Sequence, residues 1–322
     1  MKRIAALLSL ALACGAATQS FAQGPYPNRV VKIVVGFPAG TSTDIVARIY
    51  AQKLSEKLGQ QFIVETRTGA SSNLAAEGVA RSEPDGYTLF LGTVANTISA
   101  SAFKNLKFDL TKDFEPIAVV ANAPNILVVN AAAGVSSIQD LIKLAKAKPG
   151  EINYGSAGTG TAPHLSGELF NMLTGAKLTH VPYRGNNQGL IDMVSGRITA
   201  IFAPAPTVAG FLKDDRVKAL AVTSAKRSSL APDLPTLAEL GLSGFDTSIW
   251  YGFMAPKGTP AAVLQTIADV VLAANSDADV NAQLKASFAE PLSMQRDEFA
   301  TFLKADIEKW KKVVEFAGVS ME

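Results

Sequence analysis

The sequence predicts an α/β protein built from two α/β units. Short β-branched runs alternate with segments of helical period along the 322-residue chain, which is the pattern of strands joined by helices. The pattern restarts after Ala121, and a glycine-rich turn between a strand and a helix occurs once in each half. We therefore expect two units joined by more than one chain crossing, with the C-terminal segment returning to the first unit.

The first unit is predicted to open with a buried strand over 30–36 and a helix over 43–58. Gly59 follows the last periodic residue, and glycine commonly ends a helix. A strand over QFIVET (61–66), a helix near 74–81 and a strand over TLFLGT (88–93) come next. This order is typical of βαβ units and a largely parallel sheet.

The second unit repeats this order of strand, turn and helix. NILVVN (125–130) predicts a strand, and Ser137 with Asp140 resembles a capping box that starts a helix. INYGS leads into the turn AGTGTA (157–162) and a further helix. Later segments predict strands in LTHVPY, ITAIFA, VKALAVT and YGFMAP, and helices near 189–194, 208–213, 260–275 and 296–316.

The N-terminus has the layout of a secretory signal over residues 1–22. Basic Lys2 and Arg3 precede an apolar run, and Ser20-Phe21-Ala22 stands before Gln23. We therefore expect a periplasmic protein. Cys14, the single cysteine, raises lipid anchoring as the alternative, but Ala11 fits a lipoprotein box poorly. Cleavage after Ala22 leaves no thiol, which excludes disulfides and cysteine chemistry.

Charge and hydropathy exclude other classes. Removing Lys2 and Arg3 from 30 basic residues leaves 28, against 28 acidic residues, so the net charge of the mature chain is near zero. This charge does not favour binding to nucleic acid or to an anionic membrane. No later stretch is apolar enough to span a bilayer.

Two turns are candidate anion sites: FPAGTSTD (37–44) and AGTGTA (157–162). Amides at a helix N-terminus favour anions. Phosphate is disfavoured because the chain has no Gly-Lys dipeptide and no dinucleotide fingerprint. The remaining candidate ligand is a carboxylate bound by both turns. The hydroxyl groups that could bind it belong to Thr41, Ser42, Thr43, Thr159 and Thr161. Such a site would close around its ligand.

Catalysis and metal binding have little support. There is no Gly-x-Ser-x-Gly elbow, and only His164 and His180 could act as a histidine base. His164 can equally pair with Glu168 or cap the turn, and two histidines 16 apart match no common metal spacing. We expect no enzyme activity, metal or cofactor; an exported hydrolase using His164 is the alternative.

Other polar and aromatic residues leave two interpretations open. Arg184, in Tyr183-Arg184-Gly185, can pair with a second carboxylate or lie solvated on the surface. Residues 71–73 can bind ligand or cap a helix. Trp250 and Tyr251 can line a pocket or pack a hinge.

Several blocks resemble one family nearly from end to end. They include YPNRVVKIVVGFPAG, SEPDGYTLFLGT, NYGSAGTGTAPHLSGELF, HVPYRG and WYGFMAPKGTP. On these blocks the chain resembles the Bug/TctC family, the extracytoplasmic solute receptors of tripartite tricarboxylate transporters. The resemblance implies a two-lobed type II periplasmic-binding-protein fold with a ligand cleft between the lobes. We expect lobe 1 over 23–123 and 246–322, and lobe 2 over 124–245.

The resemblance also implies the site. A ligand carboxylate is expected between the two turns, with the distal part read by residues 71–73, Thr93, 183–185 and the neighbourhood of Trp250. The full predicted set is Phe37, Gly40, Thr41, Ser42, Thr43, Asp44, Ser71, Ser72, Asn73, Thr93, Ala157, Gly158, Thr159, Thr161, His164, Tyr183, Arg184, Gly185 and Trp250.

The chain departs from the family pattern at three places. Thr41 stands where a second glycine is common, Ser71-Ser72 replaces a glycine pair, and Arg184 stands where lysine is frequent. A planar guanidinium suits a distal carboxylate. The expected ligand is therefore a small dicarboxylate, aliphatic or aromatic, with Trp250 slightly favouring a ring.

The expected partners follow from the resemblance. They are the permease subunits of a tripartite transporter, with a sensor kinase as the alternative, and a monomer is expected.

Overall fold

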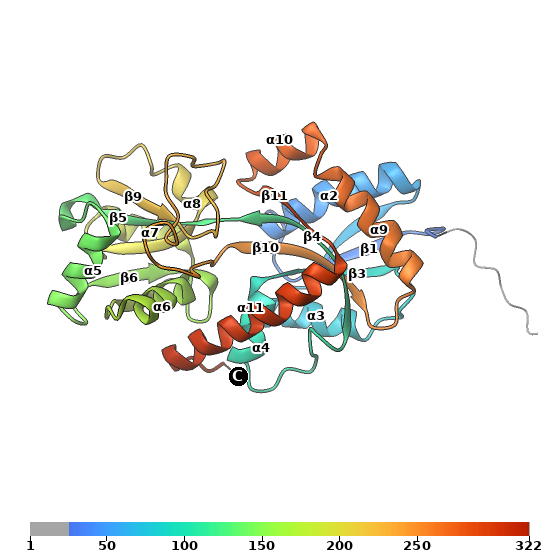
Figure 1. Ribbon diagram of the computed structural model, residues 1–322. Helices are drawn as coiled ribbons and strands as arrows, with labels where there is room; N and C mark the ends of the chain where they lie inside the picture. The colour runs from blue at the N-terminus through green and yellow to red at the C-terminus, as the bar shows by residue number, and fades with distance from the viewer. Residues whose placement is uncertain (1–25, 322) are drawn as a thin grey trace, which may run out of the picture.

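Two separate β-sheets organise the computed structural model, which describes residues 26–321 (Figure 1). The predicted signal segment, 1–22, and Cys14 lie outside the described residues. Each sheet carries helices on its faces, and the two resulting lobes lie side by side. Within the described residues, no helix is long and apolar enough to cross a membrane.

The first sheet has six strands in the order β11-β4-β10-β3-β1-β2. Three strands are parallel to one another: β1 (Val31–Val35), β2 (Phe62–Thr66) and β3 (Thr88–Thr93). The antiparallel strands are β4 (Phe114–Ala123), β10 (Ile249–Pro256) and β11 (Glu290–Met294). Four of the five residues of β1 are buried, as expected for a parallel strand covered on both faces.

The helices of the first lobe flank this sheet (Figure 1). They are α2 (Ser42–Leu58), α3 (Asn73–Ala80) with the short η1 (Ala70–Ser72) before it, α4 (Val94–Ala102), α9 (Ala261–Ala274), α10 (Ala278–Ala286) and α11 (Arg296–Ala317). Gly59 ends α2 at φ 69° and donates its N–H to Ser55, which confirms the predicted helix end.

The second sheet has five strands in the order β7-β6-β8-β5-β9. They are β5 (Asn125–Asn130), β6 (Asn153–Ser156), β7 (Thr179–Pro182), β8 (Ala200–Pro204) and β9 (Val217–Val222). Around them lie η2 (Ala131–Ala133), α5 (Ile138–Ala147), α6 (Ala162–Thr174), α7 (Asn186–Val194) and α8 (Ala205–Ala209). The Ser137 side chain accepts from the Asp140 N–H, which confirms the predicted start of α5.

The chain passes between the sheets twice. β4 and β5 are separated only by Pro124, and the return runs between β9 and β10. Buried Asn125 joins the two passages, because its amide donates to the Thr247 carbonyl at 2.9 Å. In addition, α11 packs against α4 of the first lobe and α6 of the second (Figure 1).

The structure differs from the sequence expectation in a few elements. The predicted helix over 208–213 is wrong, because the helix lies at Ala205–Ala209 and turns follow it. Two helices, α4 and α10, and two strands, β4 and β11, were not predicted. The α4 segment, VANTISASA, mixes small and polar residues, so its sequence has no clear apolar stripe.

Candidate ligand-binding cleft

A cavity of about 570 Å³ lies between the lobes and is lined by residues of both. From the first lobe, the predicted residues that line it are Phe37, Thr41, Ser42, Thr43, Ser71 and Thr93. From the second lobe, they are Ala157, Thr161 and Arg184. The structure therefore brings the two predicted turns together around one space.

Four helices of 9 or more residues begin at this cavity: α2, α4, α6 and α7. Their first residues, or the N-cap residues Thr41, Thr93 and Thr161, belong to its lining. Each helix start carries a partial positive charge of about half an elementary charge and backbone N–H groups without an intrahelical partner. Their convergence favours an anion.

The first turn is held by Asp44. Its Oδ2 accepts from the Gly40 N–H at 2.9 Å and from Nε of Arg48 at 3.0 Å. Burial alone would raise the pKa of the Asp44 carboxyl, but the hydrogen bonds from Arg48 and Gly40 outweigh burial and lower it. Asp44 is therefore ionised and shapes the turn from behind, while Thr41 to Thr43 face the cavity.

The second turn is held by His164 and Ser156. The His164 Nδ1 accepts from the Gly160 N–H at 3.0 Å, and the Ser156 hydroxyl accepts from the Gly158 N–H at 3.0 Å. Thr161 donates its hydroxyl to the Gly158 carbonyl at 2.7 Å. Gly158 and Gly160 have φ of 124° and 76°, which favour glycine.

The two histidines stack behind this turn. The ring centroids of His164 and His180 are 3.9 Å apart. Burial lowers the pKa of His164 to about 3, with a contribution from His180, and burial lowers the pKa of His180 to about 4. Both rings are neutral at neutral pH, and since Nδ1 of His164 is an acceptor, its proton lies on Nε2.

These neighbours argue against hydrolytic chemistry. Ser156 approaches Nε2 of His180 at 2.6 Å but is fully buried, and His164 is itself only 4% exposed. Ser156 and His164 are therefore shielded from a substrate by their burial, and none of Ser156, His164 and His180 lines the cavity between the lobes.

The segment Ala70–Ser72 has an unusual backbone. Three consecutive residues other than glycine have positive φ, at 46°, 53° and 76°. Such conformations cost about 1 kcal/mol or more each and persist where the surroundings enforce them. Gly36 permits the arrangement, because a Cβ there would lie 2.0 Å from the Ser72 hydroxyl. The result places Ser71 in the lining of the cavity.

Arg184 is the charged residue among those that line the cavity. It also lines an adjoining hollow of about 360 Å³ with Asn186, Asn187 and Thr207. The guanidinium is exposed and makes no ion pair with an acidic residue within 26–321. It is therefore available to an anion that enters from this side.

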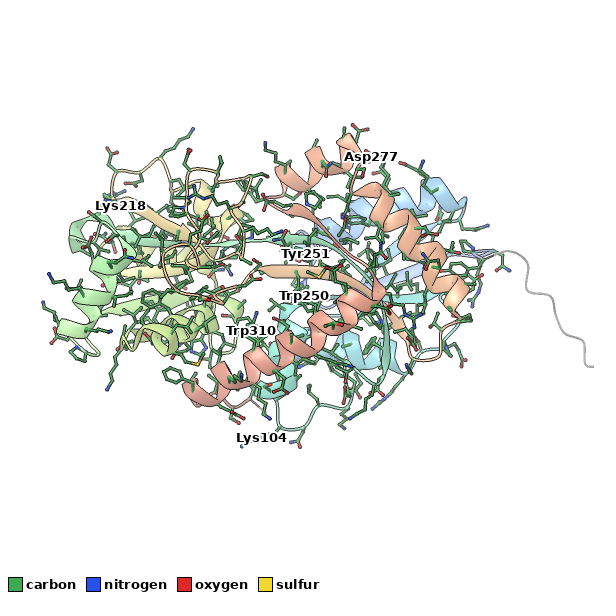
Figure 2. The ribbon with its side chains drawn as sticks, viewed as in Figure 1. Lys104, Lys218, Trp250, Tyr251, Asp277 and Trp310 are labelled. Atoms are coloured by element: carbon green, nitrogen blue, oxygen red, sulfur yellow. The ribbon has the colours of Figure 1, made fainter. Side chains whose placement is uncertain are left out.

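Trp250 lies in the core between β10 and α11 (Figure 2). It is 3% exposed, and its indole N–H donates to the Asp306 carboxylate at 3.1 Å. Its neighbour Ile249 lines the cavity instead. Other predicted residues outside the lining are Gly40, Asp44, Ser72, Asn73, Gly158, Thr159, His164, Tyr183 and Gly185. Contact of these residues with a ligand stays a prediction.

Eight lining residues were not in the predicted set. They are Val94, Ala95, Gly160, Ala162, Pro163, Asn186, Pro204 and Ile249. A sequence signal existed for the first two, because Thr93 and Asn96 form a capping box that marks the start of α4. Gly160 and Ala162 lie inside the predicted second turn, 157–162.

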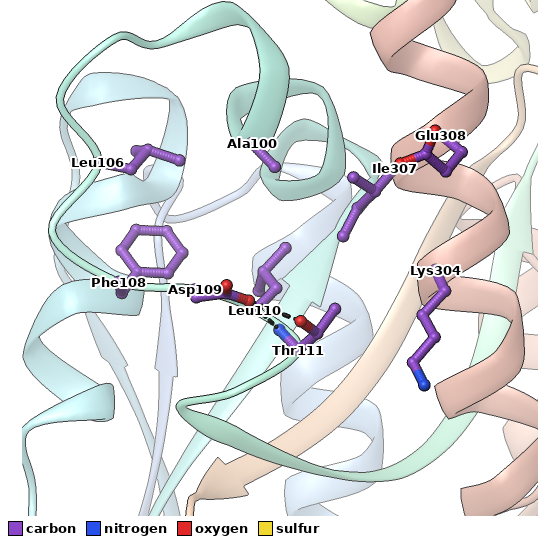
Figure 3. Close-up of a pocket in the computed structure, with 9 residues that line it drawn as sticks. All are labelled: Ala100, Leu106, Phe108, Asp109, Leu110, Thr111, Lys304, Ile307 and Glu308. Atoms are coloured by element: carbon purple, nitrogen blue, oxygen red, sulfur yellow. Dashed lines mark hydrogen bonds between the residues drawn. The ribbon is translucent and has the colours of Figure 1, made fainter.

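A second cavity, of about 530 Å³, lies between α4, residues 106–111 and α11 (Figure 3). Its wall is largely apolar, with Leu106, Phe108 and Ile307. The Asp109 carboxylate at its edge is already engaged by the Thr111 N–H and by Lys112. Neither glycine-rich turn reaches this cavity, so we place the candidate ligand site in the cleft between the lobes.

Comparison with known proteins places this cleft in context. Residues 46–319 match the family model described as "Tripartite tricarboxylate transporter family receptor". The chain is also similar to a solved R. palustris protein with adipate, at 36% identity and a TM-score of 0.77, covering 92% of this chain and 99% of the other.

Two further solved structures are also similar to the chain in sequence and fold. The periplasmic binding protein BugD is 31% identical, with a TM-score of 0.74, covering 92% of this chain and 100% of the other. MatC from Rhodopseudomonas palustris with bound malate is 30% identical, with a TM-score of 0.73, covering 90% and 100%. These likenesses confirm the predicted two-lobed α/β fold and the predicted resemblance.

Proposed function

Because the chain belongs to the tripartite tricarboxylate transporter receptor family, we propose that it captures a small dicarboxylate and delivers it to membrane subunits of such a transporter. Proteins of this family are solute-binding receptors and not enzymes, which confirms the predicted lack of catalysis. Family members are periplasmic binding proteins.

One observation carries the proposal: four helix starts and one guanidinium converge on a cavity whose described lining contains no acidic residue. The turns of the two lobes supply donors for one carboxylate, and Arg184 supplies a fork for a second. A monocarboxylate would leave the Arg184 guanidinium without a partner. A ligand with two carboxylates uses both parts of the cleft.

The lining favours an aliphatic diacid over an aromatic one. Among the described lining residues, Phe37 supplies the aromatic side chain. The indole of Trp250 donates to Asp306 in the core and so does not offer a ring to the ligand. The neighbours solved with adipate and malate hold aliphatic diacids, which supports the same choice.

The test is a binding panel on the mature protein. Thermal shift and calorimetry compare adipate and malate with phthalate, an aromatic diacid, butyrate, a monoacid, and citrate, a triacid. A ligand at a hundred times its Kd stabilises the folded state by about 2.7 kcal/mol, which raises the melting temperature. We expect the aliphatic diacids to give the tightest binding. Failure of every carboxylate to bind would overturn the proposal.

Delivery to a transporter is a separate part of the proposal. Removing the gene should abolish uptake of the radiolabelled diacid by intact cells. Unchanged uptake would favour the alternative, a receptor that presents the ligand to a sensor kinase.

Export, oligomeric state and lobe limits complete the proposal. We expect cleavage after Ala22 and a monomer, with lobes at 23–123 plus 246–322 and at 124–245. Mass spectrometry of the exported protein should find Gln23 at the N-terminus; a lipidated Cys14 would contradict this.

A further inference from the structure

The chain after α11 folds back onto the first lobe. Gly318 ends α11 at φ 63°, and the tail then runs beside the end of α4 (Figure 1). The Met321 N–H donates to the Ala102 carbonyl at 2.7 Å, and the Met321 carbonyl accepts from the Lys104 N–H at 3.3 Å. These two bonds fix the backbone of Met321 to the first lobe.

The side chain of Met321 reaches the second lobe. A Cβ built on Gly160 would lie 2.6 Å from both Sδ and Cε of Met321, so the thioether packs directly on the backbone of Gly160. Gly160 is buried, lines the cavity and donates its N–H to His164. One residue of the tail thus contacts the binding turn from behind, although it does not itself line the cavity.

This contact exists in the arrangement in which both turns line one cavity. Moving the second lobe away from the first would draw Gly160 away from Met321, because the Met321 backbone is bonded to α4. The contact therefore stabilises the closed arrangement over an open one. A methionine suits this position, since its unbranched thioether adapts to an irregular surface.

We propose that Met321 is a clasp that holds the second binding turn against the first lobe and thereby sets the affinity for the ligand. The inference rests on the proposed function of the cleft. When only a fraction of the receptor molecules is in the closed form, the apparent Kd equals the intrinsic Kd divided by that fraction. A smaller closed fraction therefore weakens binding. Met321 is thus a positioning residue, and its effect on affinity should exceed its effect on stability.

The experiment compares four mature proteins: wild type, Met321→Ala, Met321→Leu and Val319→Ala. Val319 is the matched control, because it is an apolar tail residue that packs on the same core, whereas the atoms nearest to a Cβ on Gly160 all belong to Met321. Calorimetry uses adipate and malate as probes. We expect Met321→Ala to weaken binding about five- to tenfold, Met321→Leu to retain it, and Val319→Ala to change Kd by less than about twofold.

A second measurement needs no ligand. Small-angle X-ray scattering of the free proteins should give a larger radius of gyration for Met321→Ala than for Val319→Ala. If wild type binds neither acid, the proposed diacid function fails, and scattering alone decides the clasp. If wild type binds and Met321→Ala matches it in both Kd and radius of gyration, the clasp is wrong. Should Met321→Ala not fold, Met321→Gln, which keeps the side-chain length, replaces it in the same comparison.

Discussion

Arg184 is the residue that should distinguish one carboxylate from two. In Arg184→Ala, the diacids lose a bidentate, charge-assisted pair, whose removal costs about 1.5–3 kcal/mol. We expect adipate and malate to bind roughly ten- to a hundredfold more weakly, while butyrate changes by less than about twofold. Calorimetry on the same protein samples measures both.

Arg197→Ala is the control for this change. Arg197 also carries a charge in the second lobe, but it pairs with Asp192 at 2.7 Å and does not line the cavity. We expect its loss to leave both classes of ligand unaffected. Equal losses for diacid and monoacid in Arg184→Ala would refute the role of Arg184 in reading a second carboxylate.

Trp250 illustrates what a residue type alone cannot decide. The sequence placed it near a chain return, where a pocket wall and a packed hinge were equally compatible with an aromatic. The structure buries its indole against Phe299 of α11 and bonds its N–H to Asp306, which the sequence places 56 residues away. Such a choice depends on a long-range partner that no local pattern identifies.

At the scale of elements, the helix ends that the sequence predicted correctly were those marked by residues next to them in the chain. Helix α2 ends at Gly59, and Ser137 caps α5, because both depend on neighbouring residues. The left-handed path of Ala70–Ser72 had no local signal, since serine seldom adopts it. Packing of Ser72 on Gly36 accompanies that path, and the two residues are far apart in sequence.

The histidine stack behind the second turn predicts how stability depends on pH. His164 has a pKa of about 3 in the folded protein and about 6.5 when unfolded, so the unfolded state takes up its proton first as pH falls. The contribution of neutral His164 to the free energy of unfolding is fully present above pH 6.5. It is lost as the pH falls below 6.5, by about 1.4 kcal/mol per pH unit for this buried ring. His180, with a pKa of about 4, adds a contribution of the same sign.

Urea denaturation between pH 6.5 and pH 5 measures this loss in a range above the ordinary titration of carboxyl groups. His180→Gln removes one of the two titrating rings, so its stability should decline less steeply with falling pH than that of wild type. Identical slopes for the two proteins would contradict the assignment.

At the scale of the molecule, the two lobes contact each other at several places. Links between them include the two chain passages, the contacts of α4 and α11 with α6, the hydrogen bond from the Ser229 N–H to the Glu290 carboxylate, and the tail at Met321. The sequence predicted the two units because the strand, turn and helix device recurs. It could not predict which polar groups join the passages, because those bonds connect residues more than a hundred positions apart.

Asn125 is the side chain that joins the two passages. Its amide donates to the Thr247 carbonyl at 2.9 Å, and the Thr247 hydroxyl accepts from Ser166 of α6 at 2.7 Å. All three residues are fully buried. A change at Asn125 therefore alters the geometry that positions α6, whose start forms part of the binding turn.

Asn125→Ala should therefore lower both stability and affinity. The buried Thr247 carbonyl loses its side-chain donor, which costs about 1–3 kcal/mol of unfolding free energy. We expect diacid binding to weaken about three- to tenfold as the closed arrangement becomes less populated. Asn153→Ala is the control, because Asn153 accepts from the Thr199 N–H at 2.7 Å within one lobe. Its loss should reduce stability and leave Kd unchanged, whereas an unchanged Kd in Asn125→Ala would show that the passages do not control closure.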